Sequence, residues 1–198
     1  MPLKTICCIL LLGLCLTCGG AHAASAFTPD QLKKMSVFLS NFTEVYLMQY
    51  PNDSGPEELV LFGIRHNYIN NYKSRIQSCT TPQCEWGSAV IDAKYVRESV
   101  KRYFDIDLAA FLNIDNEYGK YIYDGTRYHF SLADGDMGIH ARVTAAQEID
   151  GQVHMSGVLY NSEDKNQILG TVKAIAKPYT WKGKPTWALL RLACRQNN

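Results

Sequence analysis

Residues 139–161 read IHARVTAAQEIDGQVHMSGVLYN, and this stretch decides the fold because apolar and polar side chains alternate on both sides of Asp150-Gly151. A period of two is typical of a half-buried β-strand, and an Asp-Gly pair between two such runs predicts a β-hairpin. If Asp150, Gly151 and Gln152 form a three-residue loop, one face of the hairpin becomes apolar. That face then holds Ile139, Ala141, Val143, Val153, Met155 and Leu159.

Strand patterns continue in both directions from this hairpin. Downstream, ILGTVKAIAKPYT (168–180) and WALLRLAC (187–194) each follow a polar turn. Upstream, YIY (121–123) leads through Asp124-Gly125 into RYHFSLA (127–133). Consecutive short strands joined by turns predict one curved antiparallel meander.

Three helices are expected before the strands. Thr28 begins a capping box, and Ser54 repeats this device for a second helix that includes FGIRHNYINNYKSRI (62–76). A third helix follows Asp92. Helices followed by a run of strands predict an α+β domain, with about three N-terminal helices packed on one face of the curved sheet. This layer order resembles those of cystatin-like and NTF2-like folds.

The N-terminus is typical of an exported protein. The apolar run at 6–18 has the length of a signal-peptide core and is too short to span a membrane. Ala21-His22-Ala23 fits cleavage after Ala23, which leaves residues 24–198 as a single domain in the periplasm or outside the cell. Alternatively, LTCG (16–19) resembles a bacterial lipobox, in which case Cys18 carries a lipid that anchors the protein to the membrane.

Charge and cysteine content restrict the function classes. Without residues 1–23 the chain has 19 basic and 19 acidic residues, and this balance argues against nucleic acid as a partner. In an oxidising compartment, the spacing CTTPQC predicts a disulfide between Cys79 and Cys84. A redox or metal pair is the alternative, but the spacing is not C-x-x-C and no second pair matches it. Cys194 is expected to be a buried, inert thiol.

A polar groove between the second helix and the sheet is the first candidate site. In the proposed register, His129, Arg142 and Tyr160 form one row across three strands, although a solvent-exposed sheet face explains the same pattern. Arginine and histidine there favour an anionic or carboxylate-bearing ligand. The full candidate set is Arg65, His66, Tyr68, Asn70, His129, Arg142 and Tyr160.

The last hairpin is the second candidate site. Its aromatic and basic side chains suit recognition of a protein partner or cell-wall component. The alternative is that Trp181 and Trp187 form a cross-strand pair with a purely structural role. The candidate residues are Tyr179, Trp181, Lys182, Lys184 and Trp187.

The sequence contains no known catalytic motif, and we expect no cofactor and no metal. HExxH, GxSxG, the P-loop and GxGxxG are all missing. If the protein is an enzyme, the alternative is a small-molecule hydrolase or lyase that uses Arg65, His66, His129 and Arg142 in the groove. His66 by itself is expected to be a structural residue.

Four segments carry a resemblance to a known group. MSVFLSNFTE (35–44), residues 62–71, YFDID (103–107) and the pattern Y-x-Y-D-G (121–125) are similar to an uncharacterised group of secreted or lipid-anchored bacterial proteins. The resemblance implies export and a single domain, and no activity. The layer order is also similar to that of small secreted inhibitors of cell-wall hydrolases. We therefore expect a non-enzymatic binding or interaction domain of the cell envelope, and inhibition of a wall hydrolase is one form of that role.

Overall fold

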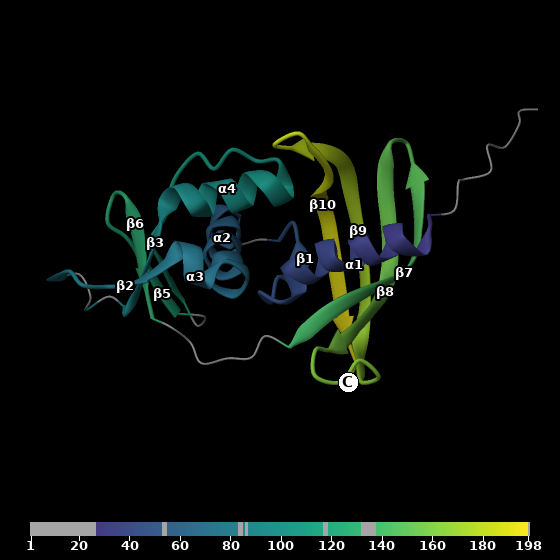
Figure 1. The fold of residues 1–198 in the computed structure, drawn as a ribbon, viewed down its shortest axis with the longest axis horizontal. Coiled ribbons are helices and arrows are strands. Elements are labelled where there is room, and N and C mark those ends of the chain that lie inside the picture. The colour runs from purple at the N-terminus through teal and green to yellow at the C-terminus, as the bar shows by residue number, and fades with distance from the viewer. Residues whose placement is uncertain are drawn as a thin grey trace, which may run out of the picture.

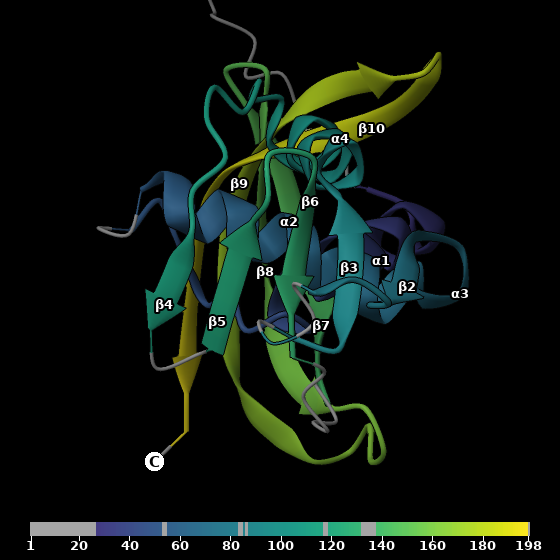
Figure 2. The same ribbon diagram turned by 90° about the vertical axis from the view of Figure 1, so that its left-hand side faces the viewer.

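The computed structural model describes residues 27–52, 55–82, 85, 87–116, 119–131 and 138–197. In these ranges the chain is an α+β domain with two antiparallel five-stranded sheets, and helices lie between them (Figures 1 and 2). The predicted signal peptide, Ala23 and Cys18 lie outside the described residues, as do Ser54 and Cys84.

The first sheet, sheet A, contains the predicted meander. Its strand order is β1-β10-β9-β8-β7, and β7 to β10 are consecutive in sequence. Their bounds are β7 Ile139–Ile149, β8 Gln152–Asn161, β9 Ile168–Trp181 and β10 Lys184–Gln196. The short strand β1 (Gln49–Tyr50), which sequence analysis did not predict, pairs with β10.

The prediction of one continuous sheet was wrong, because residues 119–130 pair elsewhere. Sheet B has the order β2-β3-β6-β5-β4 (Figure 2). Its bounds are β2 Ile76–Ser78, β3 Ala89–Asp92, β4 Ile114–Asn116, β5 Gly119–Tyr123 and β6 Arg127–Phe130. The apolar residues of β3 are fully buried and give β6 a partner, and Tyr128 and Phe130 are buried with them in the core.

Helices α2, α3 and α4 lie between the two sheets, and α1 lies across sheet A (Figure 1). They are α1 Pro29–Thr43, α2 Pro56–Asn70, α3 Tyr72–Arg75 and α4 Ala93–Phe104. Thr28 and Gln31 form the predicted capping box of α1, whereas the N-cap of α2 is Gly55 and not Ser54. The second helix is shorter than predicted, since α2 ends at Asn70 and β2 begins at Ile76. An aromatic cluster joins the helices and includes Phe42, Phe62, Tyr103 and Phe104.

Helix α1 also covers the free edge of sheet A. Ser36, Ser40 and Thr43 lie on one side of the helix, since they are separated by four and three residues. Ser40 Oγ accepts the N–H of Ala141 at 3.0 Å and also lies 3.3 Å from its carbonyl oxygen. Ser36 accepts the N–H of Val143 at 2.9 Å, and Thr43 donates to the carbonyl of Ile139 at 2.8 Å. These bonds use the backbone groups that an edge strand otherwise leaves open.

The faces of the β7–β8 hairpin were predicted correctly, but the turn was not. Gln152 pairs with Ile149, so the loop has two residues, Asp150 and Gly151, both with positive φ. The extra residue is instead at Thr144, where a bulge shifts the register between Val143 and Ala145. Because a bulge and a longer loop each move the strand by one residue, both place the apolar side chains on the core face.

Candidate ligand-binding site

A hollow of about 750 Å³ lies on the outer face of sheet A, away from the core. Except for Pro51, the residues that line it belong to three successive cross-strand rows, which the pairing of β7, β8, β9, β10 and β1 defines. The first row is Gln147, His154, Ile175 and Arg191. The middle row is Ala146, Met155, Ala174, Leu192 and Tyr50. The third row is Ala145, Ser156, Lys173, Ala193 and Gln49.

The three rows play different parts because side chains alternate between the faces of a sheet. Met155, Ala174 and Leu192 of the middle row are buried, so their side chains point into the core and their backbone forms the floor. The side chains of the other two rows project outward and form the walls. Alanine and serine dominate the third row, and these small side chains leave the floor open.

The walls of the hollow are basic. Lys173 and Arg191 are exposed, His154 is half-buried, and none of the described residues that line the hollow is Asp or Glu. Lys177, further along β9, is paired with Asp105 at 2.7 Å, whereas Lys173 and Arg191 have no such carboxylate among the described residues. Arg142 lies on the same face, opposite Val158 on β8. The site therefore offers two permanent positive charges to a ligand.

Polar groups without charge complete the walls. The amides of Gln49 and Gln147 and the hydroxyl of Ser156 can donate or accept hydrogen bonds. A volume near 750 Å³ is within the usual range of about 300–1,000 Å³ for small-molecule sites. Guanidinium and ammonium groups bind carboxylates through charge-assisted hydrogen bonds. The arrangement suits an anionic ligand that also presents amide or hydroxyl groups.

The predicted groove residues do not form one site. His129 pairs with Val90 and Ile122 in sheet B, so the predicted row with Arg142 and Tyr160 was wrong. Arg142 and Tyr160 do meet in sheet A, where the guanidinium carbon lies 5.3 Å from the centre of the ring. The four side chains of the enzyme hypothesis are thus divided between the core and two sheets.

Among the groove residues of α2, His66 belongs to the core. It is 3% exposed, and its ring nitrogens contact Asn41, Tyr103 and Ser99 at 3.1–3.3 Å. Burial, and then the positive charges of Arg102 and Arg75, lower the pKa of His66 to about 3. The imidazole is neutral at physiological pH, as expected of a structural histidine.

The other groove residues of α2 serve as links between elements. Arg65 donates to the hydroxyl of Tyr121 at 3.3 Å, and Tyr68 packs edge-on against Tyr72 and Phe130. Asn70 Nδ2 lies 3.5 Å from Glu44, which in turn lies 3.6 Å from His140. Glu44 therefore joins the end of α2 to β7.

The last hairpin is tied to the helices. Trp181 lies opposite Lys184 and Trp187 opposite Pro178, so the two tryptophans are not the predicted cross-strand pair. Trp187 packs against Phe38, with ring centroids 5.8 Å apart. Lys182 lies 5.4 Å from the ring of Trp181 and forms an ion pair with Glu98 of α4. Tyr179 lies opposite Thr186, inside the hairpin.

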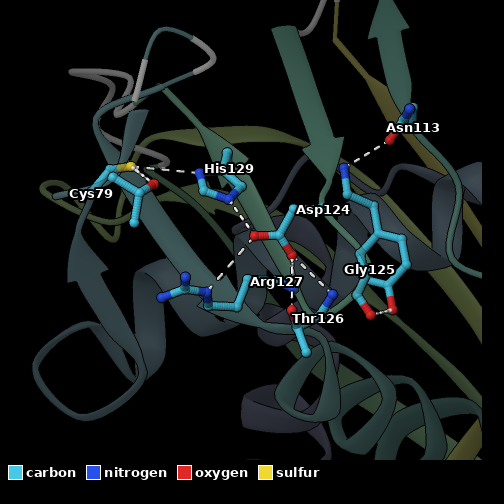
Figure 3. A network of polar contacts seen from close by, with 9 residues as sticks. Cys79, Asn113, Asp124, Gly125, Thr126, Arg127 and His129 are labelled. Carbon is cyan, nitrogen blue, oxygen red and sulfur yellow. Dashed lines mark hydrogen bonds and ion pairs between the residues drawn. The ribbon is translucent and has the colours of Figure 1, made fainter. Parts of the chain in front are cut away.

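Sheet B contains a second polar cluster, which is centred on Asp124 (Figure 3). Oδ2 lies 2.7 Å from Nε2 of His129, and Oδ1 accepts the backbone N–H groups of Thr126 and Arg127 at 2.9 and 2.7 Å. Burial raises the pKa of the Asp124 carboxyl, but the hydrogen bonds from His129, Arg127 and Thr126 together lower it well below its usual range. Asp124 is therefore ionised at neutral pH.

The other nitrogen of His129 faces a cysteine. Nδ1 lies 3.5 Å from Sγ of Cys79, and the imidazole is fully buried. Of the described cysteines, Cys194 is a free thiol and Cys79 is not. The predicted partner Cys84 lies outside the described residues, so the Cys79–Cys84 pairing stays a prediction. Cys194 is half-buried and not fully buried as predicted, and burial raises the pKa of its thiol to about 11.

Sequence analysis identified part of the basic hollow and missed its centre. It placed Arg142 on the polar side of the hairpin, and alternation with the apolar Val153, Met155 and Leu159 puts His154 and Ser156 on that same side. It did not find Arg191, because strict alternation puts this residue on the same face as the buried Leu189. A bulge between these two residues turns Arg191 outward and Leu192 inward. The lining by β1 could not be predicted either, since a two-residue strand has no measurable period.

No family model, curated protein or solved structure matches this chain. In the described ranges, no group of His, Cys, Asp or Glu side chains is arranged to hold a metal ion. No helix there is long and apolar enough to cross a membrane.

Proposed function

We propose that the protein is an exported, non-enzymatic binding domain of the cell envelope, and that it holds a carboxylate-bearing cell-wall component on the outer face of sheet A. The observation that carries the proposal is the hollow itself, where Arg191 projects from the first row and Lys173 from the third, and where no Asp or Glu is among the described residues that line the walls. The apolar run at 6–18 and Ala21-His22-Ala23 support export, and a lipid at Cys18 is the proposed route to the membrane if the lipobox is used.

The chemistry of the walls favours a peptide-like ligand. Lys173 and Arg191 would each bind a carboxylate, while Gln49, Gln147 and Ser156 would bind the amide groups between them. Fragments of a cell wall that carry free carboxylates on short peptides have this combination of groups. The half-buried Ile175, which lies opposite Arg191, gives such a ligand an apolar contact.

Isothermal titration calorimetry with a matched pair of probes tests the proposal. N-acetyl-Ala-Glu carries two carboxylates, and its analogue N-acetyl-Ala-Gln amide carries none. We expect the acidic probe to bind and the neutral one to bind at least about tenfold more weakly, because charge-assisted hydrogen bonds are worth about 1.5–3 kcal/mol each. The affinity should also fall as salt is raised from 50 to 500 mM.

Charge variants then locate the binding to the hollow. The double variant Lys173→Gln/Arg191→Gln should weaken the acidic probe at least about tenfold, since both ionic contacts are lost. Lys33→Gln/Lys34→Gln removes the same charge from the exposed side of α1 and serves as the control. Equal affinity of the two double variants for the acidic probe would reject the site. If the protein captures an envelope protein and does not bind the acidic peptide, that result would support the interaction role predicted from the sequence.

Helix α1 crosses the curved sheet A, and this arrangement supports, as a proposal, the comparison with the layer orders of cystatin-like and NTF2-like folds. Inhibition of a cell-wall hydrolase remains a proposal of the same kind. An assay of wall degradation in the presence of the protein tests it, with no inhibition as the result that rejects it.

A further inference from the structure

Positive charge on the outer face of sheet A continues beyond the hollow. The hollow contains two outward-facing rows, which carry Arg191 and Lys173. The next outward-facing row lies outside the lining of the hollow and consists of Arg142, Val158, Thr171 and Arg195. Arg195 is exposed, as are Arg191 and Lys173. The three consecutive outward-facing rows therefore each contain at least one exposed cation.

Arg191, Lys173 and Arg195 define a basic stripe along two neighbouring strands. Arg191 and Arg195 lie on β10, and Lys173 lies between their rows on β9, opposite Ala193. Outward-facing rows are two residues apart along a strand, which is about 7 Å, and neighbouring strands are about 5 Å apart. The three cations thus follow the strand direction at a regular interval, with a sideways step that long Lys and Arg side chains can span.

We propose that the carboxylate-bearing ligand of sheet A is an extended, peptide-like chain that lies along β9 and β10 and places one carboxylate against each cation of the basic stripe. This assignment rests on the function proposed above, and it adds the shape of the ligand, the spacing of its carboxylates and a third contact residue, Arg195. Alternate side chains of an extended peptide point to the same side and are about 7 Å apart. Acidic residues at every second position of such a chain therefore match the spacing of the rows.

The charges around the basic stripe favour a polyanion. Among the described residues, the outward-facing positions of the three rows include no Asp or Glu, and none of the three cations forms an ion pair with a described carboxylate. Arg142, at the far end of the third row, contacts only the ring of Tyr160 and the carbonyl of Lys165, so its charge adds to the field. Lys177, the next outward-facing residue along β9, is paired with Asp105. The unpaired positive charge therefore begins at the hollow and extends away from Lys177.

Small side chains leave room for the ligand along the basic stripe. Ala193 lies between Arg191 and Arg195 on β10, and Ala145 and Ser156 share the row of Lys173. A chain can approach the sheet here without displacing a large side chain. Because Arg195 is exposed and lies outside the hollow, its ion pair with the ligand should change the affinity by only a few-fold.

Two peptides of the same composition and charge test the spacing. In an extended chain, acetyl-Glu-Ala-Glu-Ala-Glu amide has all three carboxylates on one side, whereas acetyl-Ala-Glu-Glu-Glu-Ala amide turns its middle carboxylate away. In isothermal titration calorimetry with the exported protein at low salt, we expect the alternating peptide to bind about threefold or more tightly than its isomer, as one additional exposed ion pair allows. Equal affinities for the two isomers would overturn the inference.

Substitutions of Arg195 then locate the third contact. Arg195→Gln should bind the alternating peptide about threefold more weakly than the natural protein does, and should no longer distinguish it from its isomer. Arg195→Lys keeps the charge and should keep the distinction. Lys33→Gln removes one exposed charge from α1 and serves as the control. If Arg195→Gln still prefers the alternating peptide as the natural protein does, the third contact is wrong.

Two further probes separate the remaining outcomes. If the natural protein binds N-acetyl-Ala-Glu in the hollow but binds the two isomers equally, the extended ligand is rejected and the proposed function stands. If it binds none of these three probes, both fail. Polygalacturonate carries a carboxylate on every sugar but no peptide groups, and tighter binding of this polymer per carboxylate than of the alternating peptide would identify an acidic glycan and overturn the peptide-like ligand.

Discussion

Acidification should destabilise this protein through His66. The imidazole is 3% exposed, and its ring nitrogens contact Asn41, Tyr103 and Ser99. Asn67 donates to Ser99 Oγ at 2.9 Å, and the serine hydroxyl can donate to Nδ1 of a neutral His66 at 3.3 Å. Protonation of Nδ1 would remove this acceptor and would place a charge in the core.

The size of the effect follows from the pKa of His66. Burial, together with the charges of Arg102 and Arg75, lowers this pKa to about 3, compared with 6.5 in the unfolded chain. Between these values the unfolded state binds a proton that the folded state does not, so stability decreases as the pH falls. Each pH unit between these two pKa values lowers the free energy of unfolding by about 1.4 kcal/mol, so the loss at pH 5 is about 2 kcal/mol. That is a large part of a typical folding free energy of about 5–15 kcal/mol.

Urea unfolding at pH 7.5 and pH 5.0, at constant ionic strength, measures this loss. At pH 7.5, His66→Gln should be less stable than the natural protein, because the imidazole that contacts three polar side chains is replaced. On acidification, its free energy of unfolding should fall by about 2 kcal/mol less than that of the natural protein. His154→Gln, a change on the outer face of sheet A, is the control and should keep the full pH dependence. If His66→Gln has the same pH dependence as the natural protein, or if the His66 ring titrates near pH 6.5 by NMR, the reasoning is refuted.

Three further predictions concern the packing, and thermal or urea unfolding measures all of them. Ser40→Ala should cost about 1–3 kcal/mol because it leaves buried backbone groups of Ala141 without a partner, whereas the exposed Val37→Ala should cost less than about 0.5 kcal/mol. Trp187→Ala should destabilise the protein by about 2 kcal/mol or more, because the contact with Phe38 is lost, and by more than Trp181→Ala. The reverse order would show that the tip of the hairpin contributes more to stability than this contact. Gly157→Ala should destabilise by at least about 1–3 kcal/mol, since a Cβ there would lie 2.0 Å from the carbonyl oxygen of Arg142; an unchanged midpoint would mean that the strands separate easily.

Local patterns were sufficient to predict the parts of the fold that neighbouring residues determine. The capping box at Thr28, the start of α4 after Asp92 and the hairpins of β7 to β10 all follow from patterns within a few residues. Sheet B could not be predicted in this way, because β6 pairs with β3 across a separation that includes the whole of α4. Strand alternation shows which face is apolar but does not identify the partner strand.

Only some residues of the candidate site could be predicted, because the alternation of side chains does not reveal a change of register within a strand. Alternation identified the outer face of β8, and it fails for Arg191 because the bulge in β10 is not visible in the order of apolar residues. The Cys79–His129–Asp124 cluster depends on the turn at Asp124, which brings its carboxylate back to His129 on the next strand. The sequence indicated the turn at Asp124 and singled out Cys79 separately, and only the three-dimensional structure places Cys79 beside His129.

We propose that the hollow on sheet A binds carboxylate-bearing ligands, and an NMR titration with N-acetyl-Ala-Glu tests this binding most directly. The backbone amides of the three rows on β1, β7, β8, β9 and β10 should shift in proportion to bound ligand, with the side-chain signals of Lys173 and Arg191 among the largest changes. Amides of sheet B and α2 should not move. Saturable shifts that are confined to another surface, or no shifts at millimolar probe, would show that the hollow is not the binding site.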